Sequence, residues 1–250
     1  MRRLLHEMNP SLKFLAVTAC MLALAFFFNP WTPLMFFLGI VLMQLLFSQT
    51  NWKLWLLVML PFVIGAFGYF WTTLVFGVSG DGPVLWTIGM IEITAQKWEH
   101  AWSLSLRVLA FSSISLLFAF TTDPVRFIQS LMQQGKLSPK LAFSVLISYQ
   151  FLPVIKTEFE QLRQAHRLRG PGAKPTPFKR ITALRRLLIP LLAGAVRKAE
   201  RAAFAMEARA FTGAARSHYR EIKLGHKDYA LLGMFLFVLA ISCSAVFGHN

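Results

Sequence analysis

Long apolar segments constrain this chain more than any other feature of its sequence. Four of them precede residue 122, at about 12–28, 32–48, 54–76 and 103–121, and a fifth covers about 229–247. A helix needs about 20 mainly apolar residues to cross the hydrocarbon core of a bilayer, so each segment is long enough, or nearly so, to span a membrane. The composition agrees, since 56% of the residues are hydrophobic. We therefore predict an all-α membrane protein with about five transmembrane helices.

A basic segment separates the fourth apolar segment from the fifth. Residues 122–227 contain 20 of the 26 Lys and Arg residues and 6 of the 11 Asp and Glu residues. Positive charge close to membrane-spanning segments is retained on the cytoplasmic side. The sequence thus predicts a four-helix transmembrane region at 1–121, a basic region of long cytoplasmic or interfacial helices at 122–227, and a C-terminal transmembrane helix at 228–250.

The charge pattern also predicts the orientation of the chain. Arg2, Arg3 and Lys13 favour a cytoplasmic N-terminus, and four spans return the chain to that side before the basic region begins. The segment 77–101 then lies outside. One further span takes the C-terminus outside as well.

Within the basic region we expect three helices, at about 124–134, 140–169 and 178–215. The last contains Pro190, where a kink is expected because proline removes a backbone hydrogen bond and clashes with the preceding turn. The segment 170–177 has three Pro and two Gly and is predicted to be a loop.

Two apolar stretches inside these helices, 141–155 and 181–196, could also form a hairpin that crosses the membrane. The first contains Gln150 and Pro153, and the second contains two adjacent arginines. Polar and charged residues of this kind favour amphipathic helices that lie at or under the membrane.

No catalytic or metal-binding pattern occurs in the sequence. GxxxxGK[ST], GxSxG and HExxH are all absent. The only cysteines are Cys20 and Cys243, which lie inside separate apolar segments and have no zinc-ligand spacing. The net charge of +15 is concentrated in one segment and does not indicate a nucleic-acid-binding surface. We expect no cofactor, no metal, no nucleic-acid partner and no catalytic activity in the chain itself.

The fourth apolar segment contains one deeply placed charge and several small polar residues. A charge inside the membrane is a candidate functional group, but Arg107 lies toward the outer end, so its side chain is expected to extend to the interface. The serines are expected to allow close helix packing. They are Ser103, Ser105, Ser112, Ser113 and Ser115.

Two short phrases in the basic region match each other. "QAHRLRG" lies at the end of the first long helix, and "FAMEARAF" lies 40 residues later in the second. The aligned residues are Ala165 with Ala205, Arg169 with Arg209, and Gly170 with Ala210, and Ala208 precedes the second arginine. A small residue one helical turn before an arginine leaves a shallow notch beside the guanidinium, where another protein can dock.

Helix termination by Gly170 would explain the first phrase alone. The repeat, in which Glu160 and Glu200 also align, instead indicates two similar docking surfaces for two similar partners.

These phrases, placed between four N-terminal spans and one C-terminal span, resemble the transmembrane T component of energy-coupling factor transporters, the EcfT/CbiQ family. In that family, two Ala-Arg-Gly motifs dock on two ABC-type ATPase subunits, or on one fused pair, in a bacterial or archaeal cell membrane. A separate membrane S component captures a vitamin or metal ion. The resemblance implies that Arg169 engages one ATPase and Arg209 the other. Because Ala210 replaces the motif glycine, the second helix is expected to continue through the motif.

Two other classes of function stay open from the sequence. An intramembrane enzyme would need ionisable groups that converge near the membrane, and only Arg107, Glu92 and Glu99 are available. A stand-alone channel or carrier would be expected to show broken helices or paired polar residues at mid-membrane.

Overall fold

The computed structural model describes residues 4–27, 29–48, 51–77, 83–88, 91–168, 177–211, 221–222 and 224–247. The chain forms two compact units. The membrane unit joins Met1–Gly135 to Ile222–Asn250, and the α7–α8 unit is Lys136–Glu221. The chain therefore leaves the membrane unit once and returns to it once.

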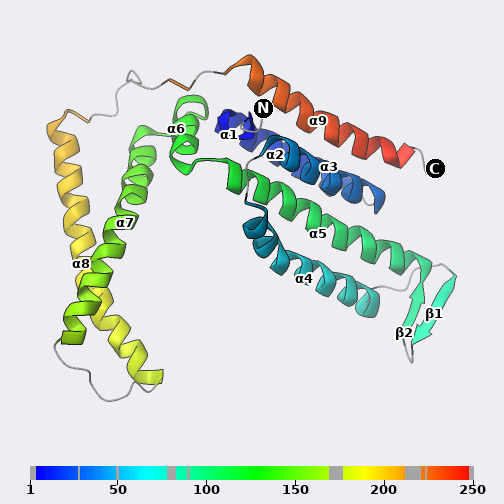
Figure 1. The fold of residues 1–250 in the computed structure, drawn as a ribbon, viewed down its shortest axis with the longest axis horizontal. Helices are drawn as coiled ribbons and strands as arrows, with labels where there is room; N and C mark the ends of the chain where they lie inside the picture. Colours follow the sequence, from blue (N-terminus) through cyan, green and yellow to red (C-terminus); the bar gives the residue numbers. More distant parts are fainter. Residues whose placement is uncertain are drawn as a thin grey trace. The chain divides into compact units, whose positions relative to one another are not determined.

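The membrane unit is mainly helical (Figure 1). Its elements are α1 Leu4–Glu7, α2 Pro10–Phe26, α3 Trp31–Phe47, α4 Trp52–Phe76, β1 Val84–Ile88, β2 Ile91–Thr94, α5 Ala95–Thr121, α6 Pro124–Gln134 and α9 His226–Phe247. Helices α4 and α5 are long and apolar enough to cross a bilayer, and α2, α3 and the Asp228–Ser244 part of α9 are shorter apolar helices. The predicted all-α membrane fold is confirmed.

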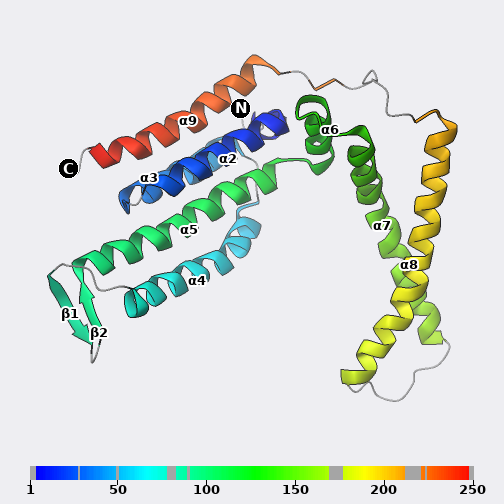
Figure 2. The same ribbon diagram turned by 180° about the vertical axis from the view of Figure 1, so that it is seen from behind.

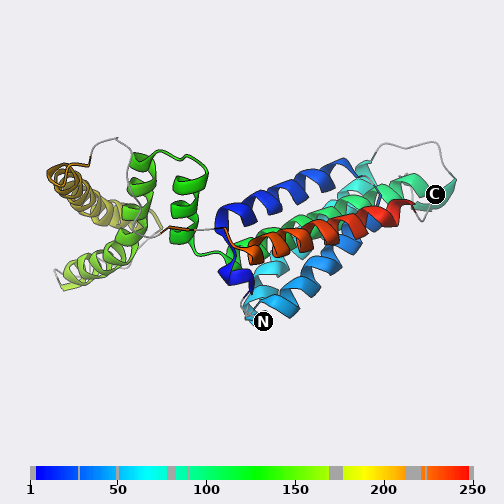
Figure 3. The same ribbon diagram turned by 90° about the horizontal axis from the view of Figure 1, so that it is seen from above.

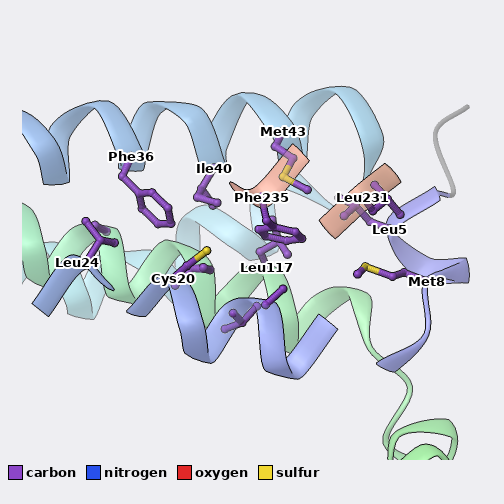
Figure 4. Packing of buried hydrophobic residues seen from close by; sticks show 14 residues of the cluster. Leu5, Met8, Cys20, Leu24, Phe36, Ile40, Met43, Leu117, Leu231 and Phe235 are labelled. Carbon is purple, nitrogen blue, oxygen red and sulfur yellow. The ribbon is translucent and has the colours of Figure 1, made fainter. Parts of the chain in front are cut away.

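Helix α5 holds a central place in this unit. It packs against α2, α3 and α4, while α9 packs against α2 and α3. Figures 1, 2 and 3 show these helices side by side. Their inward side chains form one apolar core in which Phe36, Leu117 and Phe235 are fully buried (Figure 4).

Small residues let the neighbouring helices approach α5 closely. Ala101 and Ala110 are fully buried, and Ser112 and Ser113 are also buried. The Ser112 hydroxyl donates to the Val108 carbonyl at 2.6 Å, and the Ser113 hydroxyl donates to the Ala110 carbonyl at 2.9 Å. Because these hydroxyls bond within their own helix, they can lie in an apolar interface without an unpaired donor. Close packing by these serines is confirmed, although Ser115 faces outward.

Lys13 is a structural residue of the membrane unit. Its side chain is only 1% exposed. The Nζ group donates to the Leu5 carbonyl at 2.8 Å and to the hydroxyl of Thr121. This buried amine therefore joins α1, α2 and the last turn of α5.

Arg107 bonds to the end of a neighbouring helix. Its guanidinium, which is half-buried, donates to the carbonyl of Phe27 directly after α2. A cation at this place pairs with carbonyls that the helix leaves without intrahelical partners, and it complements the helix dipole. Arg107 thus has a structural role at the end of α2.

The segment before α5 contains a β-hairpin that was not predicted from the sequence. Strands β1 and β2 are antiparallel, with Trp86 opposite Ile93 and Val84 opposite Thr94. Ile93 is buried against Leu74 and Ala101. The side chain of Thr94 accepts a hydrogen bond from the Lys97 amide and caps α5. The fourth span therefore begins at Ala95, eight residues before the predicted start at 103.

The contact between α3 and α9 gives a test of this packing. A methyl group added at Gly39 would lie 2.6 Å from Cγ1 of Val238, whereas one added at Gly65 on α4 would meet nothing within 4 Å. We expect Gly39→Ala to destabilise the protein by about 1–3 kcal/mol, because a β-branched side chain yields little to overpacking.

The measurement is the thermal unfolding midpoint in detergent, and Gly65→Ala is the matched control. Because alanine favours a helix over glycine, the control variant is expected to keep or raise the midpoint. Equal midpoints for the two variants would contradict the close approach of α3 and α9.

Candidate functional site

The α7–α8 unit is built from two long helices, α7 Pro139–Leu168 and α8 Pro177–Ala208. Each continues as one helix through an internal proline, Pro153 in α7 and Pro190 in α8. The helices cross, as Figures 1 and 2 show. The predicted helix starts at 140 and 178 are each within one residue of the observed starts.

An ion pair joins the two helices. The ammonium group of Lys198 on α8 donates to the carboxylate of Glu158 on α7. Both side chains are about one-third exposed, so the pair is partly shielded from water. Gly194 lies one turn before Lys198, and a methyl group placed there would be 3.9 Å from Glu158 Oε2. A small residue therefore lies directly beside the ion pair.

Each helix of the pair leaves an apolar face uncovered among the described residues. The exposed side chains recur every three or four positions, so they form one stripe on each helix. The stripes are Leu141, Val145, Tyr149 and Leu152 on α7, and Ile189, Leu192 and Val196 on α8. Neither helix is among those apolar enough to cross a bilayer. That these stretches lie at or under the membrane remains a prediction.

The first arginine phrase lies at the end of α7. Ala165 is exposed in the last turn, and the helix ends at Leu168, which is 88% exposed. Arg169 and Gly170 lie outside the described residues, as do the rest of the predicted loop up to residue 176.

Helix α8 ends within the second phrase, in a turn with two backbone hydrogen bonds. The amide of Phe211 donates to the Met206 carbonyl at 3.0 Å, and the amide of Ala210 donates to the Glu207 carbonyl at 2.9 Å. Ala210 has φ of 55°. These two bonds around a left-handed residue are a Schellman motif, which is usually made by glycine. The helix ends at Ala208, so the predictions that it continues through the motif and reaches 215 are wrong.

The end of α8 is exposed and yet attached to α7. Ala205, Ala208, Arg209 and Ala210 are all exposed. The next residue, Phe211, places its ring 5.4 Å from the ring of Phe143, measured between centroids. The left-handed turn therefore directs an aromatic anchor onto the first turns of α7 and leaves the small residues around the arginine accessible.

The two phrases lie at opposite ends of the crossed pair. Phe143 marks the position of the second phrase along α7, and Ala165 lies 22 residues further on. At 1.5 Å per residue, this corresponds to roughly 33 Å along α7. The described residues of the two phrases therefore lie far apart along α7.

The Glu158–Lys198 and Phe143–Phe211 contacts were not predicted from the sequence. Their partners are 40 and 68 residues apart. The only sequence signals were an acidic residue on one helix with a basic residue on the other, and an aromatic residue at the end of the second phrase. Among the described residues, no group of three or more His, Cys, Asp or Glu is placed to hold a metal ion.

The fold and the candidate site define a multi-pass membrane protein that carries a long, exposed and basic helical pair. The family described as cobalt transport protein, CbiQ, matches residues 1–219. The chain is 32% identical over 176 residues to the energy-coupling factor transporter transmembrane protein EcfT of Exiguobacterium sibiricum. The match covers 67% of this chain and 66% of that protein.

Longer matches cover almost the whole chain. The EcfT protein of Listeria innocua is 29% identical over 245 residues, covering 91% of this chain and 88% of its own length. The EcfT protein of Acidaminococcus fermentans is 28% identical over 256 residues, covering 95% and 90%. The chain belongs to the EcfT/CbiQ family. This membership indicates a membrane transport component of the energy-coupling factor type.

The strained end of α8 gives a prediction that concerns one residue. A left-handed conformation costs an L-residue about 1–2 kcal/mol, and glycine avoids this cost. We expect Ala210→Gly to slow hydrogen exchange in the last turn of α8. The matched control is Ala203→Gly in the helix interior, which should accelerate exchange because glycine is unfavourable there by about 1 kcal/mol. Faster exchange in both variants would contradict the Schellman motif.

The ion pair gives a second prediction. A double-mutant cycle with Glu158→Gln and Lys198→Met, read from chemical denaturation of the whole protein, should give a coupling energy of about 0.5–1 kcal/mol. The cycle that uses Glu160→Gln in place of Glu158→Gln is the control, since Glu160 is exposed. A coupling energy near zero for the Glu158 cycle would show that other contacts hold the crossing.

Proposed function

We propose that this chain is the coupling subunit of an energy-coupling factor importer. It transmits the ATP-driven movement of two ABC-type ATPase subunits, or one fused pair, to a membrane S component that captures a vitamin or metal ion. The main support is the placement of two arginine phrases at opposite ends of one exposed, crossed helical pair. The chain acts as a mechanical transducer and has no catalytic role of its own.

Each phrase suits docking of a globular partner. Arg209 follows a helix end whose neighbouring side chains, Ala205 and Ala208, are small and exposed. A partner surface can therefore approach the backbone while the guanidinium makes directional hydrogen bonds. Ala165 has the same relation to Arg169 in the sequence. We assign one ATPase to each arginine. Phe143, which contacts the second phrase, and Ala165 of the first phrase are roughly 33 Å apart along α7, which leaves room for two subunits.

The apolar stripes suit a partner of another kind. An S component and the bilayer surface both present apolar faces, and stripes on two amphipathic helices can bury against such a face. The ATPases therefore contact the ends of the pair, and the S component contacts its length. Closure of the ATPases would move the two ends, and long helices carry such a displacement without local melting.

The orientation follows from the same arrangement. ATP is cytoplasmic, so the α7–α8 unit lies on the cytoplasmic side of the bacterial or archaeal cell membrane. The charge pattern of the sequence supports a cytoplasmic N-terminus and a C-terminus outside.

Arginine substitutions test this function. We expect Arg169→Ala and Arg209→Ala each to reduce co-purification of ATPase subunits, and the double variant to abolish it. Loss of one partner of a buried charged contact costs about 2–5 kcal/mol. Arg163→Ala on α7 and Arg201→Ala on α8 remove exposed arginines from the same helices and serve as controls.

Co-purification is quantified from membranes in which all variants accumulate equally. Wild-type recovery of ATPases with the double variant would overturn the assignment of the arginines. Transport by the purified chain alone would instead support a channel or carrier.

A further inference from the structure

A polar cluster in the membrane unit lies where the chain leaves this unit and where it returns to it. This polar clasp consists of the side chains of Asn9, Ser11, Ser130, Gln133, Gln134 and Asp228 with the backbone of Ile222 and Gly225. The membrane unit ends at Gly135, next to Gln134, and resumes at Ile222. Figures 1 and 2 show α6 and the starts of α2 and α9 at the same end of the unit.

Asp228 joins the start of α9 to the start of α2. Its Oδ1 accepts from the backbone N–H of Asn9 at 2.8 Å, and its Oδ2 accepts from the backbone N–H of Gly225 at 2.9 Å. The residue is only 6% exposed. Each carboxylate oxygen of Asp228 thus accepts from a different backbone N–H. Loss of either bond would leave a buried charge partly unpaired, which is costly, so the carboxylate holds the starts of α2 and α9 at a fixed distance.

Ser130 joins α6 to the same point. Its hydroxyl, which is fully buried, donates to Oδ1 of Asn9 at 2.8 Å and accepts from the Ser11 amide at 3.2 Å. The Ser11 hydroxyl also donates to the side chain of Gln134. Helix α6 is therefore held to the first turn of α2 by several hydrogen bonds.

Two further bonds join the departing chain to the returning chain. The side chain of Gln134 donates to the Ile222 carbonyl at 3.0 Å, and the Ile222 amide donates to the side chain of Gln133 at 2.9 Å. The segment that precedes the α7–α8 unit in the chain is thus hydrogen-bonded to the segment that follows it.

We propose that the polar clasp is a closed joint through which movement of the α7–α8 unit reaches α2 and α9 during transport. The inference rests on the proposed coupling function. Hydrogen bonds of defined geometry resist sliding, whereas apolar contacts are non-directional. With the clasp closed, α6 and the returning chain move as one piece. Ser130 and Asp228 are positioning residues in this joint.

The first test removes one hydroxyl from the clasp. Ser130→Ala is compared with Ser244→Ala, which deletes an exposed hydroxyl that bonds within α9. The complete transporter is reconstituted in liposomes, and ATP hydrolysis and uptake are measured on the same preparation. The probe is whichever of radiolabelled Co²⁺, riboflavin or biotin the wild-type complex accumulates.

We expect Ser130→Ala to lower uptake per ATP hydrolysed by about five- to tenfold, with ATPase co-purification retained, because the clasp loses buried hydrogen bonds. Asp228→Asn should act in the same direction, since an amide cannot accept both backbone bonds. An unchanged ratio of uptake to hydrolysis in both variants overturns the joint. A purely structural role would lower the amount of complex and leave this ratio unchanged.

The second test locks the clasp and does not depend on the folding of those variants. Ser11→Cys with Gln134→Cys is crosslinked by a short bifunctional methanethiosulfonate reagent, with each single variant as a control for Cys20 and Cys243. A joint that stays closed predicts retained uptake after crosslinking. Loss of uptake that a reductant restores would show that the clasp must open, and it overturns the proposal.

The two proposals fail in different ways. A wild-type chain that binds no ATPase, or whose complex accumulates none of the probes, overturns the coupling function and the joint with it. Normal ATPase binding and uptake in wild type, with normal coupling in the clasp variants, overturns the joint alone.

Discussion

Close packing around α5 is the constraint on which the membrane unit depends. In a bilayer the surrounding lipid is as apolar as the helices, so association relies on shape and on satisfied polar groups. Buried alanines and serines on α5 provide the shape, and the serine hydroxyls bond to carbonyls of their own helix. Lys13 and Arg107 add polar contacts near the two ends of α2. Helix α5 is therefore closely packed where these small residues lie, and Lys13 and Arg107 each have a hydrogen-bond partner.

The α7–α8 unit follows a different principle. It joins two helices of about 45 Å length each through a partly exposed ion pair and one aromatic contact. Its apolar stripes and its ends lie open among the described residues. Helical pairs with so little shared burial gain most of their stability from further packing. The same openness that leaves the pair weak in isolation makes its surface available to the partners that we propose.

The length of the apolar segments made most of the fold predictable. Bilayer thickness fixes how long an apolar helix must be, so α2, α3, α4 and α9 begin and end within a few residues of the predicted bounds. The hairpin before α5 was missed because its strands are short and sit beside an apolar span. The end of α8 was missed because alanine seldom takes the left-handed conformation that Ala210 has. The contact of Asn9 with Asp228 joins residues 219 apart and left no local signal.

The candidate site was predicted from a repeat, and a repeat can indicate only some parts of such a site. A repeated phrase identifies the surfaces that similar partners require, because the same chemistry must be presented twice. The joint that we propose occurs once and is assembled from three separate segments of the chain, so no repeat and no spacing marks it. Coupling needs both parts. Under the function that we propose, docking surfaces without a fixed joint would let the α7–α8 unit turn on its two connections, and ATP hydrolysis would then produce movement without transport.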